Sequence, residues 1–270
     1  MAQLTIDRNG IWADNVKKNI DYPDIGNSYS FTLEENSFWF LHRNHVLLQV
    51  FKRFPFNKNF ADIGGGNGFQ AKFVADNFTH ANVFLIEPGY EGCLNGRKRG
   101  LANVYNTLFE NFDFYEHDVT AVGMFDVVEH IENDTLFLQK LKDKLPPGSL
   151  IYITVPAYNF LWSDVDDLGH HHRRYTTTSM KALGESAGLS SVFGSYFFSY
   201  LPPLTFLLRS LPYRLKGKRK DDKMFEVEKD QHNPSPLVLK VFDYFQQREL
   251  KKLEHGSVGM GASVIAVFKT

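Results

Sequence analysis

A short apolar run that ends in a cluster of glycines constrains the fold of this chain more than any other feature. Residues 59–63 read Asn-Phe-Ala-Asp-Ile, and four glycines follow within positions 64–68. Glycine tolerates positive φ angles and lets the backbone approach a ligand closely, and a helix that begins after the turn aims unpaired N–H groups at that ligand. The order strand, tight turn, helix is typical of the first unit of a Rossmann-like sheet, where ligands lie over the carboxyl ends of the strands.

The spacing of the glycines restricts which ligand the turn accepts. A dinucleotide-binding pattern, G-x-G-x-x-G, needs a third glycine at position 69, where this chain has Phe69. The pattern here is D-x-G-x-G-x-G, formed by Asp62, Gly64, Gly66 and Gly68. It resembles motif I of the class I S-adenosylmethionine-dependent methyltransferases. Glycine-rich turns also occur as purely structural corners, so the assignment needs further signals.

A carboxylate at the end of the next apolar run is the second signal. Residues 83–86 predict a strand that ends at Glu87 and Pro88, and Glu87 comes 25 positions after Asp62. A carboxylate at that strand tip can accept charge-assisted hydrogen bonds from both hydroxyls of a ribose. We therefore expect Glu87 and Pro88 to contact the cofactor. The family that the chain resembles commonly contacts the adenine through an acidic residue further on, but residues 106–108 contain none.

A third signal follows the strand predicted at residues 119–125. The chain continues Asp126-Val127-Val128-Glu129-His130-Ile131, which resembles the family motif D-V-x-E-H-I that borders both cofactor and acceptor. The resemblance assigns Asp126 to the cofactor and makes His130 a candidate general base. If this segment were helical, Asp126 and His130 would share one face.

The alternation of strands and helices predicts an α/β protein with helices on both faces of a sheet. We expect a Rossmann-like three-layer sandwich whose mostly parallel sheet has seven strands, the last one antiparallel. Within one domain, residues 1–58 would form an irregular arm and a helix that covers the site, starting at a capping box of Thr32 and Glu35. Residues 59–200 would form the cofactor-binding core, 201–258 an insertion or lid between strands 6 and 7, and 259–270 the final strand.

The most polar stretch of the chain, residues 161–176, follows the fifth predicted strand and can reach the pocket mouth. It resembles a segment of bacterial type 11/23-like methyltransferases with the pattern L-W-S…D-x-x-x-x-H-x-R-R-Y-T. The matching positions are Asp166, His171, Arg173, Arg174 and Tyr175.

This segment supplies the candidate residues for catalysis and for substrate binding. His171, like His130, could act as a general base, because an imidazole with a pKa near 6.5 accepts a proton at neutral pH. Arg173 and Arg174 could bind a carboxylate or phosphate of the substrate, and we assign Tyr175 and Trp39 to substrate contact as well. The alternative is that the acid and the arginines only fix the loop. Because histidines adjacent in sequence point apart, we expect no metal.

Composition narrows the class of partner. The chain has 270 residues, a net charge of −1, one cysteine and 15% aromatic residues. The balanced charge gives no field that would attract nucleic acid, and a single cysteine excludes an internal disulfide. With no signal-peptide pattern at its N-terminus, we expect a cytoplasmic protein that binds no nucleic acid.

The signals together predict methyl transfer from S-adenosylmethionine, with S-adenosylhomocysteine as product, to a small-molecule or lipid-linked acceptor, with oxygen as the preferred accepting atom. An NAD(P)-dependent oxidoreductase of the Rossmann fold and a non-catalytic cofactor-binding module are the alternatives. Aromatic residues from 193 onward, followed by basic residues up to Lys220, suggest either a packed lid or a weak membrane-surface contact through 193–220. The oligomeric state is not predicted.

Overall fold

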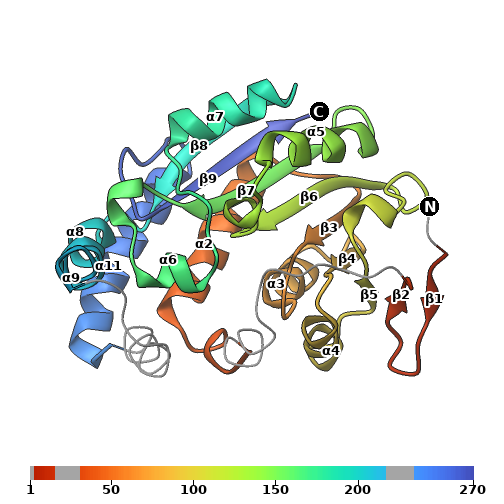
Figure 1. The fold of residues 1–270 in the computed structure, drawn as a ribbon, viewed down its shortest axis with the longest axis horizontal. Helices are drawn as coiled ribbons and strands as arrows, with labels where there is room; N and C mark the ends of the chain where they lie inside the picture. Colours follow the sequence, from red (N-terminus) through yellow and green to blue (C-terminus); the bar gives the residue numbers. More distant parts are fainter. Residues whose placement is uncertain (1–2, 16–30, 217–233) are drawn as a thin grey trace.

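A computed structural model describes residues 3–15, 31–216 and 234–270 of the chain (Figure 1). Its described strands form one sheet in the order β1-β2-β5-β4-β3-β6-β7-β9-β8. Seven of them make up the predicted core: β3 (Asn59–Ile63), β4 (Val83–Ile86), β5 (Asn103–Asn106), β6 (Val119–Phe125), β7 (Leu150–Pro156), β8 (Ser190–Phe197) and β9 (Ser263–Lys269).

The core of the sheet is parallel except at β9, as expected. Strand β3 pairs in parallel with β4 and β6, and β6 with β7, whereas β9 is antiparallel to both β7 and β8. All of β4, every residue of β3 after Asn59 and every residue of β6 except Thr120 are buried, as expected for parallel strands covered on both faces. Strands β3 and β6 lie side by side although the chain visits β4 and β5 between them. This is the switch point at which such sheets bind ligands.

Helices cover both faces of the sheet. Figure 1 shows α2 (Phe38–Arg53), α3 (Phe69–Asn77) and α4 (Tyr90–Lys98) on one side, and α5 (Asp134–Lys144) and α7 (Thr177–Ser186) on the other. The helix expected to cover the site, α2, starts later than predicted. That helix begins after Ser37, whose side chain accepts a hydrogen bond from the Trp39 N–H, so the N-cap predicted at Thr32 was wrong.

The N-terminal arm also differs from the prediction. Residues Thr5–Ile6 and Trp12–Ala13 form the antiparallel strands β1 and β2, and β2 pairs in parallel with β5. The rings of Trp12 and Tyr105 stack across this pairing with centroids 6.1 Å apart. The arm therefore extends the predicted seven-stranded sheet to nine strands within the described residues.

The segment between β8 and β9 is helical where it is described. It forms α8 (Leu201–Thr205), the π-helical η4 (Phe206–Ser210), α9 (Leu211–Lys216) and α11 (Pro236–Leu253). Helix α11 packs on α2, where His42 Nε2 lies 2.7 Å from Glu249 Oε1. The middle of the predicted lid, with the basic residues 218–220, lies outside the described residues.

Part of the segment proposed for membrane contact belongs to the core. Phe193, Tyr196 and Phe197 are buried in β8, so only the residues after this strand are available for such a contact. Among the described residues, no helix has both the length and the apolar character needed to cross a bilayer.

Three strand ends share an uncommon backbone conformation. Asp126, Tyr158 and Phe198 follow β6, β7 and β8, and each has a φ of 58°. This left-handed region disfavours residues with a side chain, bulky ones most of all. The chain thus turns away from the sheet at three successive strand ends without using glycine.

Candidate active site

The glycine turn lies at the carboxyl end of β3, beside the tip of β4. Gly64, Gly66 and Gly68 have φ angles of 67°, 51° and 72°, which explains why glycine occupies these positions. The N–H of Gly66 donates to Glu87 Oε2 at 2.8 Å, and the N–H of Gly89 donates to Oε1 at 2.6 Å. Glu87 is therefore held against the glycine turn, where the sequence placed it.

The N-terminal arm closes the next strand tip. The carbonyl of Pro88, beside Glu87, accepts a hydrogen bond from Asn106 Nδ2 at 2.8 Å. Thr107 donates its hydroxyl to the carboxylate of Asp14, which also accepts a hydrogen bond from Asn111 Nδ2 at 3.0 Å. The position where the sequence lacked an acid thus receives one from the arm. The prediction missed it because Asp14 arrives only through the pairing of β2 with β5.

Asp62 is the last residue but one of β3, two positions before the glycine turn, and is completely buried. Within the described part of the chain, neither of its carboxylate oxygens accepts a hydrogen bond of normal geometry. Burial raises the pKa of Asp62 to about 7, although the charge of Arg43 opposes the rise. A buried carboxylate without a partner is costly, so this end of β3 is suited to a ligand that carries positive charge.

Arg43 extends from α2 to the end of β6. Its Nη1 donates to Asp126 Oδ2, and Asp126 Oδ1 accepts a hydrogen bond from Thr154 Oγ1 at 3.1 Å. The predicted cofactor residue Asp126 is thus anchored by an arginine that sequence reasoning missed. Its only signal was the run of polar residues His42, Arg43 and Asn44, all of them buried, inside an otherwise apolar helix.

The residues after Asp126 form a single 3-10 turn, η2 (Val128–His130), so Asp126 and His130 do not share a helix face. Val127 covers the glycine turn, since a β-carbon at Gly64 would lie 3.0 Å from Val127 Cγ2. Glu129 is only 1% exposed, and neither of its carboxylate oxygens has a hydrogen-bond partner among the described residues. Burial raises the pKa of Glu129 well above its usual range, and the charge of Asp126 adds to the rise.

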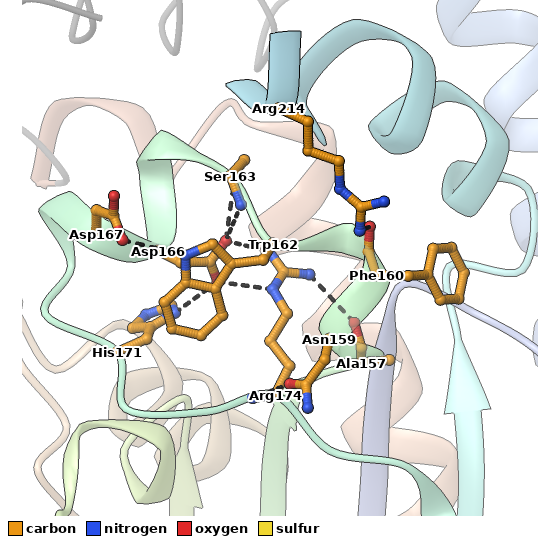
Figure 2. A network of polar contacts seen from close by, with 10 residues as sticks. All are labelled: Ala157, Asn159, Phe160, Trp162, Ser163, Asp166, Asp167, His171, Arg174 and Arg214. Carbon is orange, nitrogen blue, oxygen red and sulfur yellow. Dashed lines mark hydrogen bonds and ion pairs between the residues drawn. The ribbon is translucent and has the colours of Figure 1, made fainter. Parts of the chain in front are cut away.

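Asp166 is the centre of a polar network in the segment after β7 (Figure 2). It lies in α6 (Asp164–Leu168) and accepts a hydrogen bond from the Ser163 N–H at 2.8 Å. Arg174 binds both carboxylate oxygens, through Nε at 2.6 Å and Nη2 at 2.9 Å, and His171 Nδ1 lies 2.9 Å from Oδ1. Burial alone would raise the pKa of Asp166, but the His171 hydrogen bond and the Arg174 charge lower it to about 2.

The two histidines predicted as bases lie side by side. Because the carboxylate of Asp166 accepts a hydrogen bond from His171 Nδ1, the basic atom of His171 is Nε2. The ring centroids of His130 and His171 are 4.7 Å apart, and the His172 N–H donates to the Glu129 carbonyl at 2.8 Å, which joins the two segments. Burial, and next the charge of His171, lowers the pKa of His130 to about 4.

The two arginines predicted to bind substrate make internal ion pairs. Arg174 pairs with Asp166 and also donates a hydrogen bond to the Ala157 carbonyl at 3.2 Å. Its side chain is only 8% exposed. Arg174 thus fixes the loop through Asp166, and its contact with an acceptor stays a prediction. Arg173 pairs with Asp134 at 2.6 Å but leaves 33% of its side chain exposed, so its contact with an acceptor stays a prediction.

The two aromatic residues assigned to substrate also differ in their burial. Tyr175 is buried, and its hydroxyl donates to Asp134 Oδ2 at 2.9 Å, so it supports the loop. Trp39 stacks on Phe198 with ring centroids 4.0 Å apart and is half-buried. Its contact with substrate also stays a prediction.

Comparison with known families agrees with this geometry. Residues 39–192, more than half of the chain, match the type 23 methyltransferase-domain family. The chain belongs to this family, and the expectation of a class I S-adenosylmethionine-dependent methyltransferase is confirmed. The match gives no support to the nicotinamide-dependent alternative.

Solved structures share the fold at low sequence identity. Phosphoethanolamine N-methyltransferase 2 of Haemonchus contortus, bound to S-adenosylmethionine, has a TM-score of 0.57 and 13% identity, over 95% of this chain and 60% of that one. The plantazolicin methyltransferase BpumL, bound to S-adenosylhomocysteine, has a TM-score of 0.57 and 14% identity, over 93% and 91%. A complex of a methyltransferase with the Haloferax volcanii activator Trm112 has a TM-score of 0.56 and 14% identity, over 91% and 94%. No curated protein sequence matches.

Proposed function

We propose that the protein transfers the methyl group of S-adenosylmethionine to a hydroxyl of a small-molecule or lipid-linked acceptor that also carries an anionic group or a sugar. The observation that carries the cofactor site is Asp62, completely buried with no hydrogen-bond partner among the described residues. The cofactor is a cation at its sulfonium and amino groups, so its binding would compensate this carboxylate. When bound, it supplies an electrophilic methyl group.

The residues around Asp62 have separate parts in holding the cofactor. The glycine turn lets the backbone lie against the ligand, and Glu87 is at the strand tip where a ribose would offer two hydroxyls. Asp14 and Asn106 close the neighbouring tip, where the family contacts the adenine. Asp126, fixed by Arg43 and Thr154, borders both the cofactor and the acceptor.

Catalysis would depend mainly on position. The acceptor oxygen forms a bond to the methyl carbon while the carbon–sulfur bond breaks and its electron pair stays on sulfur, so positive charge disappears and no oxyanion site is needed. Holding the reacting atoms in line can supply about 7–11 kcal/mol of the barrier. The hydroxyl must also lose its proton, and His171 Nε2 would take it, with Asp166 orienting the ring through Nδ1.

Two surfaces support the choice of acceptor. Arg173 offers a partly exposed guanidinium beside the histidines, which suits a carboxylate or phosphate. Leu207, Leu208 and Leu237 are 57%, 58% and 74% exposed on η4 and α11, and the ring of Tyr200, directly before α8, packs on Phe242 and Phe245 of α11. An exposed apolar surface of this kind suits a lipid-linked acceptor, and a weak membrane contact with it.

Calorimetric titration followed by a turnover assay tests the proposal. We expect S-adenosylmethionine and S-adenosylhomocysteine to bind and NAD not to bind. Release of S-adenosylhomocysteine should then depend on a hydroxylated anionic acceptor, and long-chain acceptors should be preferred over short ones. Cofactor binding without product from any acceptor would instead identify a non-catalytic binding module.

His171 gives the sharper test of the site. We expect His171→Gln to lower turnover by about 10²–10⁴-fold, the usual contribution of a general base, with cofactor affinity unchanged. His172→Gln is the matched control, because its exposed side chain adjoins the same loop while its backbone hydrogen bond is kept. Equal turnover in the two variants would remove His171 from the chemistry.

A further inference from the structure

Three side chains from the end of β6 and from the segment after β7 converge on one point. Glu129, His130 and His171 each offer a ligand atom, and these atoms all lie within 4.8 Å of one another. We propose that they bind a divalent transition-metal ion that contacts the acceptor hydroxyl. The inference rests on the proposed O-methyl transfer for its catalytic part, and it replaces our expectation from the sequence that the protein holds no metal.

Glu129 is the observation that points to a cation. Glu129 is only 1% exposed, and neither of its carboxylate oxygens has a hydrogen-bond partner in the described parts of the chain. The other two acids nearby are already compensated, because Asp126 is paired with Arg43 and Asp166 with Arg174. A carboxylate in such a site is normally paired or bound to a metal. Glu129 is thus the one acid of the three that lacks its partner.

The two histidines are supported as metal ligands usually are. A histidine that binds a metal through one ring nitrogen commonly donates its other N–H to a carboxylate or a backbone carbonyl, which fixes the ring. His171 Nδ1 lies 2.9 Å from Asp166 Oδ1, and His130 makes a hydrogen bond with the backbone of Gly169. These contacts leave the remaining nitrogen of each ring for the shared point.

The ligand atoms lie farther apart here than they would around a bound ion. Histidine and carboxylate ligands lie about 2.0–2.2 Å from zinc in a tetrahedral site, which places the donor atoms about 3–3.5 Å from one another. Closing 4.8 Å to that value needs shifts of about an ångström, within reach of side-chain rotation. The hydrogen bond from His172 N–H to the Glu129 carbonyl, 2.8 Å, already holds the two backbone segments in register.

The donor set selects the kind of metal. Two imidazoles and one carboxylate suit zinc, manganese, iron or cobalt, whereas magnesium and calcium prefer oxygen ligands alone. Three protein ligands also leave coordination positions open, as in catalytic rather than structural sites. The acceptor hydroxyl can take one of them.

A metal at this point changes the part played by His171. The metal lowers the pKa of the oxygen that it binds, so the acceptor hydroxyl loses its proton to water, and the oxygen then forms its bond to the methyl carbon. His171 Nε2 would serve as a ligand in the loaded protein and as the proton acceptor only when no metal is bound. The two roles make different predictions for metal binding.

Direct titration of the metal-free protein tests the site. After dialysis against a chelator, we expect the full chain to bind one equivalent of Zn²⁺ or Mn²⁺ by calorimetry and to bind Mg²⁺ at least tenfold more weakly. The melting temperature should rise with the added metal. Failure to bind either transition metal at millimolar concentration would overturn the proposal.

Variants separate this site from adventitious binding by surface histidines. We expect Glu129→Gln and His171→Asn each to weaken Zn²⁺ binding by at least tenfold, and His172→Gln to leave it unchanged. Asp166→Asn, which alters a positioning residue, should weaken binding by about 10–100-fold. Equal affinity in Glu129→Gln and the wild type would overturn the assignment. Metal-free Glu129→Gln should melt no lower than the metal-free wild type, which excludes misfolding as the cause of a loss.

Cofactor titration keeps the two proposals distinguishable. If the wild type binds S-adenosylmethionine but no transition metal, the metal site falls and His171 stays the proton acceptor. If it binds the metal but no S-adenosylmethionine, the proposed methyl transfer falls and the metal site stands. The acceptor contact itself is tested by turnover in the chelator, which should drop at least tenfold and return with Zn²⁺ or Mn²⁺.

Discussion

Two fully buried carboxylates of the candidate site have opposite surroundings, and their pKa values shift in opposite directions. Asp166, after β7, accepts hydrogen bonds from Ser163, His171 and Arg174, and its pKa is lowered to about 2. Asp62, at the end of β3, has no hydrogen-bond partner in the described residues, and burial raises its pKa to about 7. The chain pairs the acid that positions other side chains and leaves unpaired the acid at the proposed cofactor site. Glu129 belongs to the second kind.

The largest effect on the free energy of unfolding is expected from removing the charge of Asp166. In Asp166→Asn, the buried guanidinium of Arg174 loses its counter-charge, and removing one partner of a buried pair costs about 3–5 kcal/mol of unfolding free energy. Urea denaturation at pH 7.5 measures the loss. The folded pKa of Asp166 lies below the unfolded value near 3.9. The wild-type contribution is therefore present above about pH 4 and is lost as the pH falls toward 2.

The neighbouring acid serves as the control. Asp167 accepts hydrogen bonds from Trp162 Nε1 at 3.1 Å and from the Tyr213 hydroxyl at 2.9 Å. Because such bonds contribute about 1 kcal/mol each, Asp167→Asn should cost at most about 2 kcal/mol, less than Asp166→Asn. Equal losses would show that Asp166 is not the centre of the network.

Asp62→Asn should change the stability in the opposite direction. The folded pKa of about 7 exceeds the unfolded value by about three units, and each unit corresponds to 1.36 kcal/mol. Stability from the protonated acid is therefore full below about pH 4 and is lost as the pH rises through 7. At pH 8 and without cofactor, the variant should be more stable than the wild type by about 2–4 kcal/mol, and the two should converge near pH 4. A constant difference across this range would contradict the uncompensated state of Asp62.

Glu87→Gln tests the contact of this carboxylate with the cofactor. Hydrogen bonds to a charged group contribute about 1.5–3 kcal/mol, so calorimetry should show S-adenosylmethionine affinity about 10–100-fold weaker. The exposed Glu116→Gln is the matched control and should bind normally. Normal affinity in Glu87→Gln would separate this carboxylate from the ribose.

The smallest effect is expected at Asp14. Asparagine keeps an acceptor oxygen at this position, so Asp14→Asn loses only the charge-assisted part of one hydrogen bond and should weaken S-adenosylmethionine by about 3–10-fold. Asp7→Asn alters another acid of the same arm, one that bonds to the N–H groups of Asn9 and Ile11, and should leave affinity unchanged. Equal weakening would mean that the arm acts through its fold and not through Asp14.

The core of the fold and the cofactor corner were predictable because their signals are local. Strands β4, β6 and β7 are mainly apolar runs, and the glycine turn needs backbone conformations that few residues adopt. Glu87 follows its strand directly, so its distance along the chain fixed its place. The antiparallel last strand came from the family resemblance rather than from any periodicity.

What the sequence did not show depends on contacts between distant segments. Strand β2 has two residues and no periodicity, yet it carries Asp14 to the cofactor corner. Arg43 looked like one polar residue on an apolar helix until the ends of β3 and β6 were in place. His171 meets Glu129 and His130 only because the segment after β7 folds back over the end of β6, whereas sequence alone placed it among its neighbours, His170 and His172.

The three left-handed strand ends have a consequence for anyone who wishes to adapt this protein as a biocatalyst. Strained positions of this kind cost on the order of 1 kcal/mol or more each, and glycine at Asp126, Tyr158 or Phe198 would remove that cost. Each exchange would also delete the anchor of Arg43, the ring stacked on Tyr196, or the ring stacked on Trp39. At Asp126 and Phe198 the loss outweighs the strain, because breaking a buried ion pair or deleting a buried phenylalanine ring costs about 3–5 kcal/mol. Libraries that seek heat tolerance together with new acceptors should therefore begin at Tyr158, whose ring is only half-buried.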